Sequence, residues 1–116
     1  MHLIIDGYTS DPERIKSKEL IYQFLDEYPA QIGMTKIAPP LVYEYEGGNP
    51  RDWGVSAFVL IAESHISIHT FPERAYINID IFSYKEFDAS RATRDLQRRF
   101  ALKEVRSHLM ERPFVE

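Results

Sequence analysis

The sequence predicts one α+β domain, a two-layer α/β sandwich in which a largely antiparallel sheet carries two helices on one face. Three observations lead to this fold class. Residues 76–83 alternate strictly between isoleucines and polar or aromatic residues, which is the period of a strand. Residues 58–62 form an unbroken apolar run, typical of a strand buried on both faces. Residues 20–28 and 89–100 repeat apolar side chains at helical spacing, so each predicts a helix with one apolar stripe.

The N-terminal half predicts a strand, a helix and a second strand. Residues 2–8 form a mostly apolar strand that ends at a glycine. A helix then starts at Asp11, whose carboxylate caps it, and ends near Tyr28 because a proline follows. Residues 35–46 are extended and contain a Pro-Pro pair. Because proline removes a donor from the ladder, this strand is bent or lies at a sheet edge.

The C-terminal half predicts four more elements after a Gly-Gly loop. Residues 53–62 and 65–70 form two strands, and the alternating segment that follows them forms a third. Asp88 caps a second helix, and residues 103–111 form the last strand. The order β-α-β-β-β-β-α-β is that of a single domain covering residues 1–116, without an internal repeat.

Composition excludes several classes of protein. Zero cysteines exclude disulfides, thiolate nucleophiles and cysteine-ligated zinc. A net charge of −4 argues against a nucleic-acid partner, because such proteins usually carry a basic excess. No apolar stretch approaches the roughly 20 residues that span a bilayer, and no signal pattern is present. We therefore expect a soluble, cytoplasmic protein without a membrane partner.

The second face of the predicted sheet carries both polar and large apolar side chains, so we do not expect it to be fully exposed to solvent. Opposite the isoleucines of residues 76–83 lie Asn78, Asp80 and Phe82, and Ser56 and Phe58 are expected beside them. Exposed apolar patches of this kind mark interaction sites. The sequence therefore predicts a homodimer in which a second copy covers this face.

Polar chemistry appears abruptly after the apolar run, in the segment 61–73. Its polar members are Glu63, Ser64, His65, Ser67, His69, Thr70 and Glu73. Burying so many polar groups without partners costs roughly 1–3 kcal/mol each, so they line a wet cleft or bond one another. This segment, together with Gly54-Val55-Ser56, resembles the signature of the short prokaryotic S-adenosylmethionine decarboxylases, and a looser similarity extends from His2 to about Arg112.

The resemblance implies that the chain cuts itself and makes its own cofactor. The Ser64 hydroxyl would attack the carbonyl carbon of Glu63, and the resulting ester would eliminate and hydrolyse to leave a pyruvoyl group on the downstream chain. The products would be chains of residues 1–63 and 64–116. His69 and Ser56 match the residues that transfer protons in this step. The pyruvoyl would act as the electron sink in place of pyridoxal phosphate, and no metal is needed.

The resemblance also assigns the substrate side of the site. Glu73 matches the acid that binds the substrate ribose, and Asp6 lies where the family has an acid near the cleft. Tyr84 stands where the family has its proton-donating cysteine. Pro50 stands where an aromatic stacks on adenine, a role that Trp53 can take over. The implied reaction is decarboxylation of S-adenosylmethionine for polyamine (spermidine) biosynthesis, in αββα dimers with the sites at the interface.

Other functions remain open beside this one. The acids Asp6, Asp52 and Glu73 could instead hold the cationic side chain of arginine or ornithine, and a non-enzymatic paralogue would keep the fold alone. A metal pair of His65 and His69 is disfavoured, because four residues of a strand span roughly 13 Å. A hydrolase triad built on Ser64 is disfavoured because no nucleophile-elbow glycine pattern surrounds it.

Overall fold

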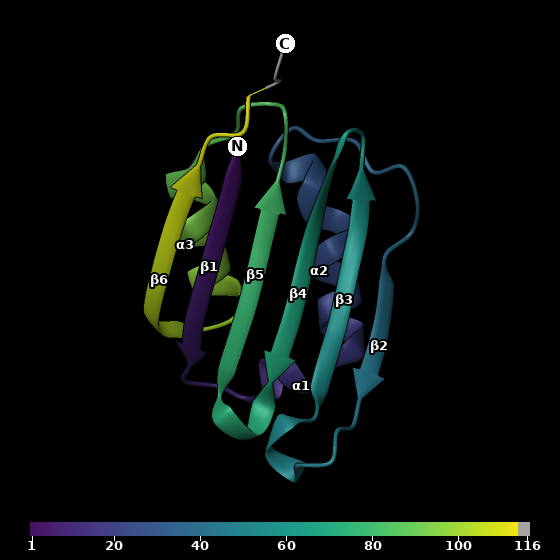
Figure 1. Cartoon of the computed structure of the whole chain (residues 1–116), viewed down its shortest axis with the longest axis vertical. Coiled ribbons are helices and arrows are strands. Elements are labelled where there is room, and N and C mark those ends of the chain that lie inside the picture. Colours follow the sequence, from purple (N-terminus) through teal and green to yellow (C-terminus); the bar gives the residue numbers. More distant parts are fainter. Residues whose placement is uncertain (114–116) are drawn as a thin grey trace.

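Six strands form one antiparallel sheet in the order β2-β3-β4-β5-β1-β6 (Figure 1). This computed structural model describes residues 1–113. The strands are β1 (His2–Thr9), β2 (Leu41–Tyr45), β3 (Gly54–Ile61), β4 (Ser64–Phe71), β5 (Tyr76–Phe82) and β6 (Leu102–Met110). β2 lies at one edge of the sheet, as the two prolines before it predict.

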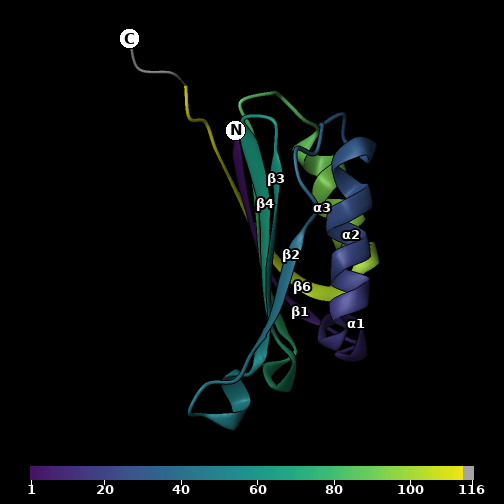
Figure 2. The same ribbon diagram turned by 90° about the vertical axis from the view of Figure 1, so that its right-hand side faces the viewer.

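All three α-helices cover one face of this sheet, which confirms the predicted two layers (Figure 2). They are α1 (Glu13–Lys16), α2 (Lys18–Gln31) and α3 (Ala89–Arg99), and the two short 3-10 helices are η1 (Pro50–Asp52) and η2 (Pro72–Arg74). The Asp88 carboxylate accepts a hydrogen bond from the backbone N–H of Arg91, so the predicted cap of α3 is confirmed. Within residues 1–113, no helix has the length and apolar character to cross a membrane.

The first predicted helix is wrong in three details. Asp11 does not cap it, because the N-cap residue is Pro12 and the Asp11 carboxylate accepts a hydrogen bond from the Arg14 side chain instead. The helix is interrupted at Ser17, which has an extended ψ of 115° and whose hydroxyl accepts a hydrogen bond from the Leu20 backbone N–H at the start of α2. α2 then runs through Pro29 to Gln31 instead of stopping before the proline. Pro29 lies in the last turn, where its missing donor removes one ladder bond only, and its carbonyl accepts hydrogen bonds from the following residues.

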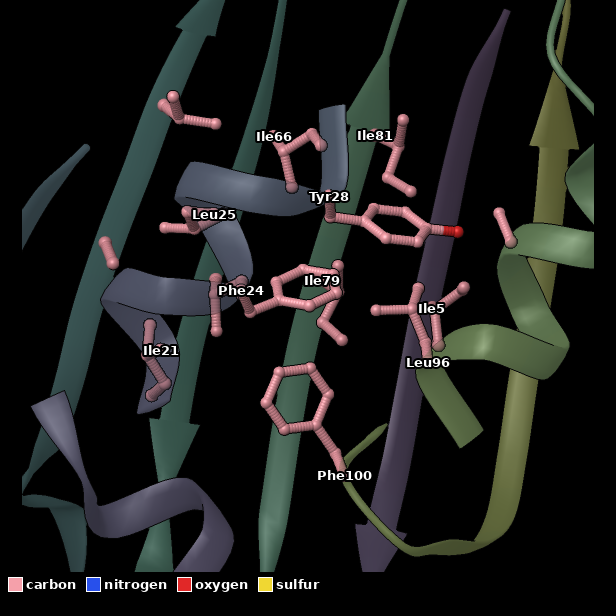
Figure 3. Packing of buried hydrophobic residues seen from close by; sticks show 14 of the residues in the cluster. Ile5, Ile21, Phe24, Leu25, Tyr28, Ile66, Ile79, Ile81, Leu96 and Phe100 are labelled. Carbon is pink, nitrogen blue, oxygen red and sulfur yellow. The ribbon is translucent and has the colours of Figure 1, made fainter. Parts of the chain in front are cut away.

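The core lies between the helices and one face of the sheet (Figure 3). Alternate residues of the central strands point into it, and α2 and α3 supply the facing side chains. Its fully buried members include Ile5, Ile66, Ile79 and Ile81 from strands and Phe24, Leu25, Leu96 and Phe100 from the helical layer. Each such side chain contributes roughly 1.5–3 kcal/mol on burial, so this layer fixes the sheet that carries the site.

Tyr28 is a polar member of this core and joins α2 to α3. Its hydroxyl donates a 2.8 Å hydrogen bond to Asp95 Oδ2, and burial together with this carboxylate raises the pKa of the phenol well above its usual range. We expect Tyr28→Phe to lower the free energy of unfolding by about 1–2 kcal/mol, because a half-buried carboxylate loses a partner. Urea unfolding measures this loss. Tyr22→Phe, on the exposed side of the same helix, should change stability little, and equal losses would contradict the assignment.

In the part of the chain that the structure describes, no helix covers the opposite face of the sheet, which is called the open face here (Figure 2). Its central residues are Tyr43, Ser56, Phe58, Leu60, His65, Ser67, His69, Asn78, Asp80 and Phe82. The expectation that β3 is buried on both faces is therefore wrong for the single chain, because Phe58 and Leu60 are 38% and 43% exposed. The polar and apolar residues expected together on the second face do share it.

Candidate functional site

The β3–β4 turn places Ser64 at one end of the sheet, called the hairpin end, where the N-terminus also lies (Figure 1). Ala62 and Glu63 form the turn, and Ser64 is the half-buried first residue of β4. Glu63 is exposed and has a left-handed φ of 64°. This conformation costs a residue with a side chain roughly 1–2 kcal/mol. The peptide between Glu63 and Ser64 is therefore accessible and follows a strained residue.

Aromatic and charged groups gather around Phe82, also at the hairpin end. The Phe82 ring lies 5.5 Å from the His65 ring, 5.1 Å from the Tyr84 ring and 5.8 Å from the His2 ring, measured between centroids. The Arg112 guanidinium carbon lies 4.4 Å above the same ring. Because His65 and Phe82 are paired across β4 and β5, this group, called the Phe82 cluster, lies next to Ser64.

The environment of His65 favours a neutral imidazole. Burial lowers the pKa of His65, and the positive charges of His2 and Arg112 lower it further, while the Asp80 carboxylate acts in the opposite direction. A neutral imidazole offers one N–H donor and one acceptor. His65 can therefore take up a proton at neutral pH.

Ser56 and His69 form a hydrogen-bonded pair nearer the other end of the sheet, called the η end because η1 and η2 lie there. They are direct partners across β3 and β4, and Ser56 Oγ lies 2.9 Å from His69 Nδ1. His69 is exposed on the open face. The pair can move a proton between a hydroxyl and an imidazole, which is the chemistry expected of these two residues.

A pocket of about 560 Å³ opens at the η end, around Trp53 and Glu73. Trp53 Nε1 donates a hydrogen bond to Glu73 Oε1 at 3.2 Å. Glu44, Glu46, Gly47, Pro50 and Arg51 complete the lining. Gly54 is required next to Trp53, because a Cβ there would lie 1.8 Å from the Thr70 carbonyl oxygen. The pocket therefore has an aromatic wall and a carboxylate held in place by it.

Asp6 lies outside this pocket. Its Oδ1 accepts a 2.6 Å hydrogen bond from Asn78 Nδ2, and it lines a separate depression of about 470 Å³ with Tyr8, Tyr76 and Arg106. Within one chain, the structure therefore does not bring Asp6 together with Glu73.

Ser64 and the Ser56–His69 pair are also separate within one chain. Ser64 and His69 are five residues apart on β4, which is roughly 16 Å along an extended strand. A groove of about 400 Å³ on the open face covers much of this interval and has Ser56, His65, Ser67 and His69 among its lining residues. The single chain holds two half-sites, one at the hairpin end and one toward the η end.

No sequence signal indicates a role for two members of the Phe82 cluster. His2 and Arg112 lie near the ends of the chain, and only the pairing of β1 and β6 with the central sheet brings them beside His65. His65 was considered as a metal ligand alone. Only a correct prediction of which strands pair, and in which register, would have placed its neighbours beside it. Among residues 1–113, no three histidine, aspartate or glutamate side chains are arranged to hold a metal ion.

Comparison with known proteins gives one consistent result. Residues 1–113 match a family model described as S-adenosylmethionine decarboxylase. An S-adenosylmethionine decarboxylase proenzyme of Archaeoglobus fulgidus is 38% identical over 82 residues, which cover 71% of this chain and 68% of that protein. A proenzyme of the same name from Clostridium botulinum is 33% identical over 105 residues, covering 90% and 85%. The crystal structure of the adenosylmethionine decarboxylase from Aquifex aeolicus superposes with a TM-score of 0.80 at 28% identity, covering 99% and 91%.

Proposed function

The chain belongs to the S-adenosylmethionine decarboxylase family, whose members are pyruvoyl-dependent decarboxylases, and we propose that it is a self-processing enzyme of this kind. It releases CO2 from S-adenosylmethionine and so supplies the aminopropyl donor of polyamine synthesis, as a cytoplasmic homodimer. The observation that carries the proposal is the 2.9 Å contact between Ser56 and His69 on the open face.

The hairpin end suits the formation of a pyruvoyl group from Ser64. The Ser64 hydroxyl attacks the Glu63 carbonyl carbon, and the amide becomes an ester. Elimination leaves the carboxylate of Glu63 on the upstream chain, and hydrolysis releases ammonia and leaves the pyruvoyl on the downstream chain. The exposed turn and the left-handed Glu63 support this assignment, because cleavage relieves the strained residue. When formed, the group supplies the electron sink for loss of CO2.

A second copy of the chain would complete the site. The roughly 16 Å between Ser64 and His69 is too long for proton transfer within one chain. Two open faces packed against each other in antiparallel orientation bring the hairpin end of one protomer onto the η end of its partner. The same packing buries Phe58 and Leu60, which are otherwise exposed.

The Trp53 pocket suits the adenosyl part of the substrate. Glu73 offers carboxylate oxygens to the ribose hydroxyls, and Trp53 both orients Glu73 and offers an aromatic face to the adenine. Stacking of a base on an aromatic ring contributes roughly 1–3 kcal/mol. Pro50 lines the same pocket, so Trp53 can replace the aromatic expected at that position. The role of Asp6 as an acid near the cleft stays a prediction. The role of Tyr84 as the proton donor also stays a prediction.

The acidic lining supports a second candidate substrate. Glu44, Glu46 and Glu73 surround the pocket with carboxylates, which also suits the guanidinium of arginine or the ammonium of ornithine. A non-processing paralogue is the third possibility, and it requires neither substrate.

Substrate assays with a pocket variant test the proposal. We expect CO2 release from S-adenosylmethionine and none from arginine or ornithine. Trp53→Leu should raise KM for S-adenosylmethionine at least tenfold, because it removes both the stacking surface and the donor to Glu73. Trp53→Phe retains the stacking surface and should raise KM less. Release from arginine or ornithine alone would establish the second candidate, and an uncleaved, inactive protein would establish the third.

A further inference from the structure

His65 lies on the open face, at the hairpin end of the sheet. It directly follows Ser64 on β4, and its ring rests 5.5 Å from the ring of Phe82. It also lines the groove that contains Ser56 and His69. The processing chemistry gives no task to this imidazole, although it is covalently next to the residue that becomes the reactive group.

Charged groups on three segments face His65. His2 on β1 and Arg112 after β6 contribute positive charge, and Asp80 on β5 contributes negative charge. β3 places the apolar Leu60 directly opposite. Asp80 Oδ2 lies 4.0 Å from His2 Nε2, so part of its charge is directed at the other histidine. Burial, together with the neighbouring His2 and Arg112, favours a His65 without a proton.

We propose that His65 is the proton carrier of the decarboxylation, a role that rests on the proposed function. Its imidazole accepts a proton from the ammonium nitrogen of the substrate and later delivers this proton to the substrate carbon that has lost CO2. The Phe82 ring holds the imidazole in place for both transfers.

The imidazole accepts one proton and later returns it, so the reaction is balanced without another acid or base. An amine must lose one proton before its lone pair can attack a carbonyl carbon, and neutral His65 takes that proton. When the bond to the carboxylate breaks, its electron pair stays with the substrate and finally forms a bond to the proton returned by His65. The imidazole is then neutral again, so no further acid or base is consumed. A lowered pKa leaves the imidazole unprotonated before the substrate binds and makes the imidazolium, once formed, a stronger donor.

Tyr84 is less suited to the first half of this cycle. A phenol hydroxyl is chiefly a proton donor, whereas the proton of the ammonium needs a base to take it. Its ring contacts the Phe82 ring and is 42% exposed. The two residues make different predictions, because Tyr84→Phe removes a donor and leaves the imidazole intact.

The test uses His65→Asn and His65→Gln, with His108→Asn on β6 as a matched control. Mass spectrometry first establishes cleavage at residue 64; failure of cleavage in the wild type would refute the proposed function itself. In cleaved protein, we expect both His65 variants to lower kcat at least about 100-fold, as loss of a general acid–base group does. His108→Asn should retain wild-type turnover.

Two further readouts separate proton transfer from a structural role. Because neutral imidazole is the active form, wild-type kcat/KM should fall as pH drops through the His65 pKa, and this acid limb should vanish in both variants. In the uncleaved Ser64→Ala chain, NMR titration should place the His65 pKa below the usual histidine value. A loss under tenfold, an unchanged acid limb, an unshifted pKa or failure of both variants to cleave would overturn the proposal. A large loss in Tyr84→Phe with full activity in His65→Asn would assign the proton to Tyr84.

Discussion

Purified wild-type protein is expected to separate under denaturing conditions into two chains, residues 1–63 and 64–116, whereas Ser64→Ala remains one chain of 13.6 kDa. The loss of cleavage should be complete, because alanine has no hydroxyl to attack the Glu63 carbonyl carbon. The substitution removes one oxygen from a half-buried residue at the start of β4, so the fold should be unaffected. Intact-mass spectrometry after incubation at neutral pH measures both species.

A serine outside the hairpin provides the control for the cleavage experiment. Ser90→Ala changes an exposed serine on α3, far from the hairpin in sequence, and should be cleaved like the wild type. A wild-type protein that stays intact during prolonged incubation would contradict self-processing. The chain would then be a paralogue that keeps the family fold without its cofactor.

The sheet and its layers could be predicted from the sequence because the sequence pattern there is purely local. The isoleucines of β5 alternate with polar and aromatic residues, and the structure buries all three of them. Asp88 precedes an amphipathic segment and caps α3 as expected. Such signals depend on a few neighbouring residues, so a period and a cap are sufficient to identify the element.

Features that depend on distant parts of the chain could not be predicted in this way. Ser17 ends α1 and caps α2, an interruption that the apolar stripe of residues 20–28 does not indicate. The apolar run of β3 indicates burial on both faces, yet the single chain covers only one, because its helices all lie on the other side of Phe58 and Leu60. Apolar pattern alone does not say whether a helix or a second protomer covers a face.

The spacing of the candidate site residues could not be predicted from the sequence either. The signature residues are close in sequence, which suggests one compact cluster, but an extended strand separates Ser64 from His69 by roughly 16 Å. Conversely, Arg112 is distant in sequence and lies over the ring of Phe82. Sequence order identified the residue types, and only strand register shows how far apart Ser64 and His69 lie within one chain. Their assigned roles stay predictions.

Two inactive chains are therefore expected to restore cleavage when they are combined. Ser64→Ala alone lacks the attacking hydroxyl, and His69→Ala alone lacks the imidazole that moves its proton, so neither should be cleaved. In a mixed dimer, the His69→Ala chain presents its intact Ser64 to the intact Ser56–His69 pair of the partner. That chain alone should be cut, while the Ser64→Ala chain stays whole.

Co-expression with a mass tag on one chain measures this directly, because each product can be assigned to its parent. Sedimentation of the purified mixture at micromolar concentration establishes that dimers form. Glu27→Gln, on the exposed surface of α2, serves as a control substitution that should not alter cleavage in either background. Cleavage of His69→Ala on its own would show that the imidazole is dispensable. Mixed dimers without any cleavage would show that a second protomer does not complete the site, since both missing groups would then be present in one dimer and still fail to meet.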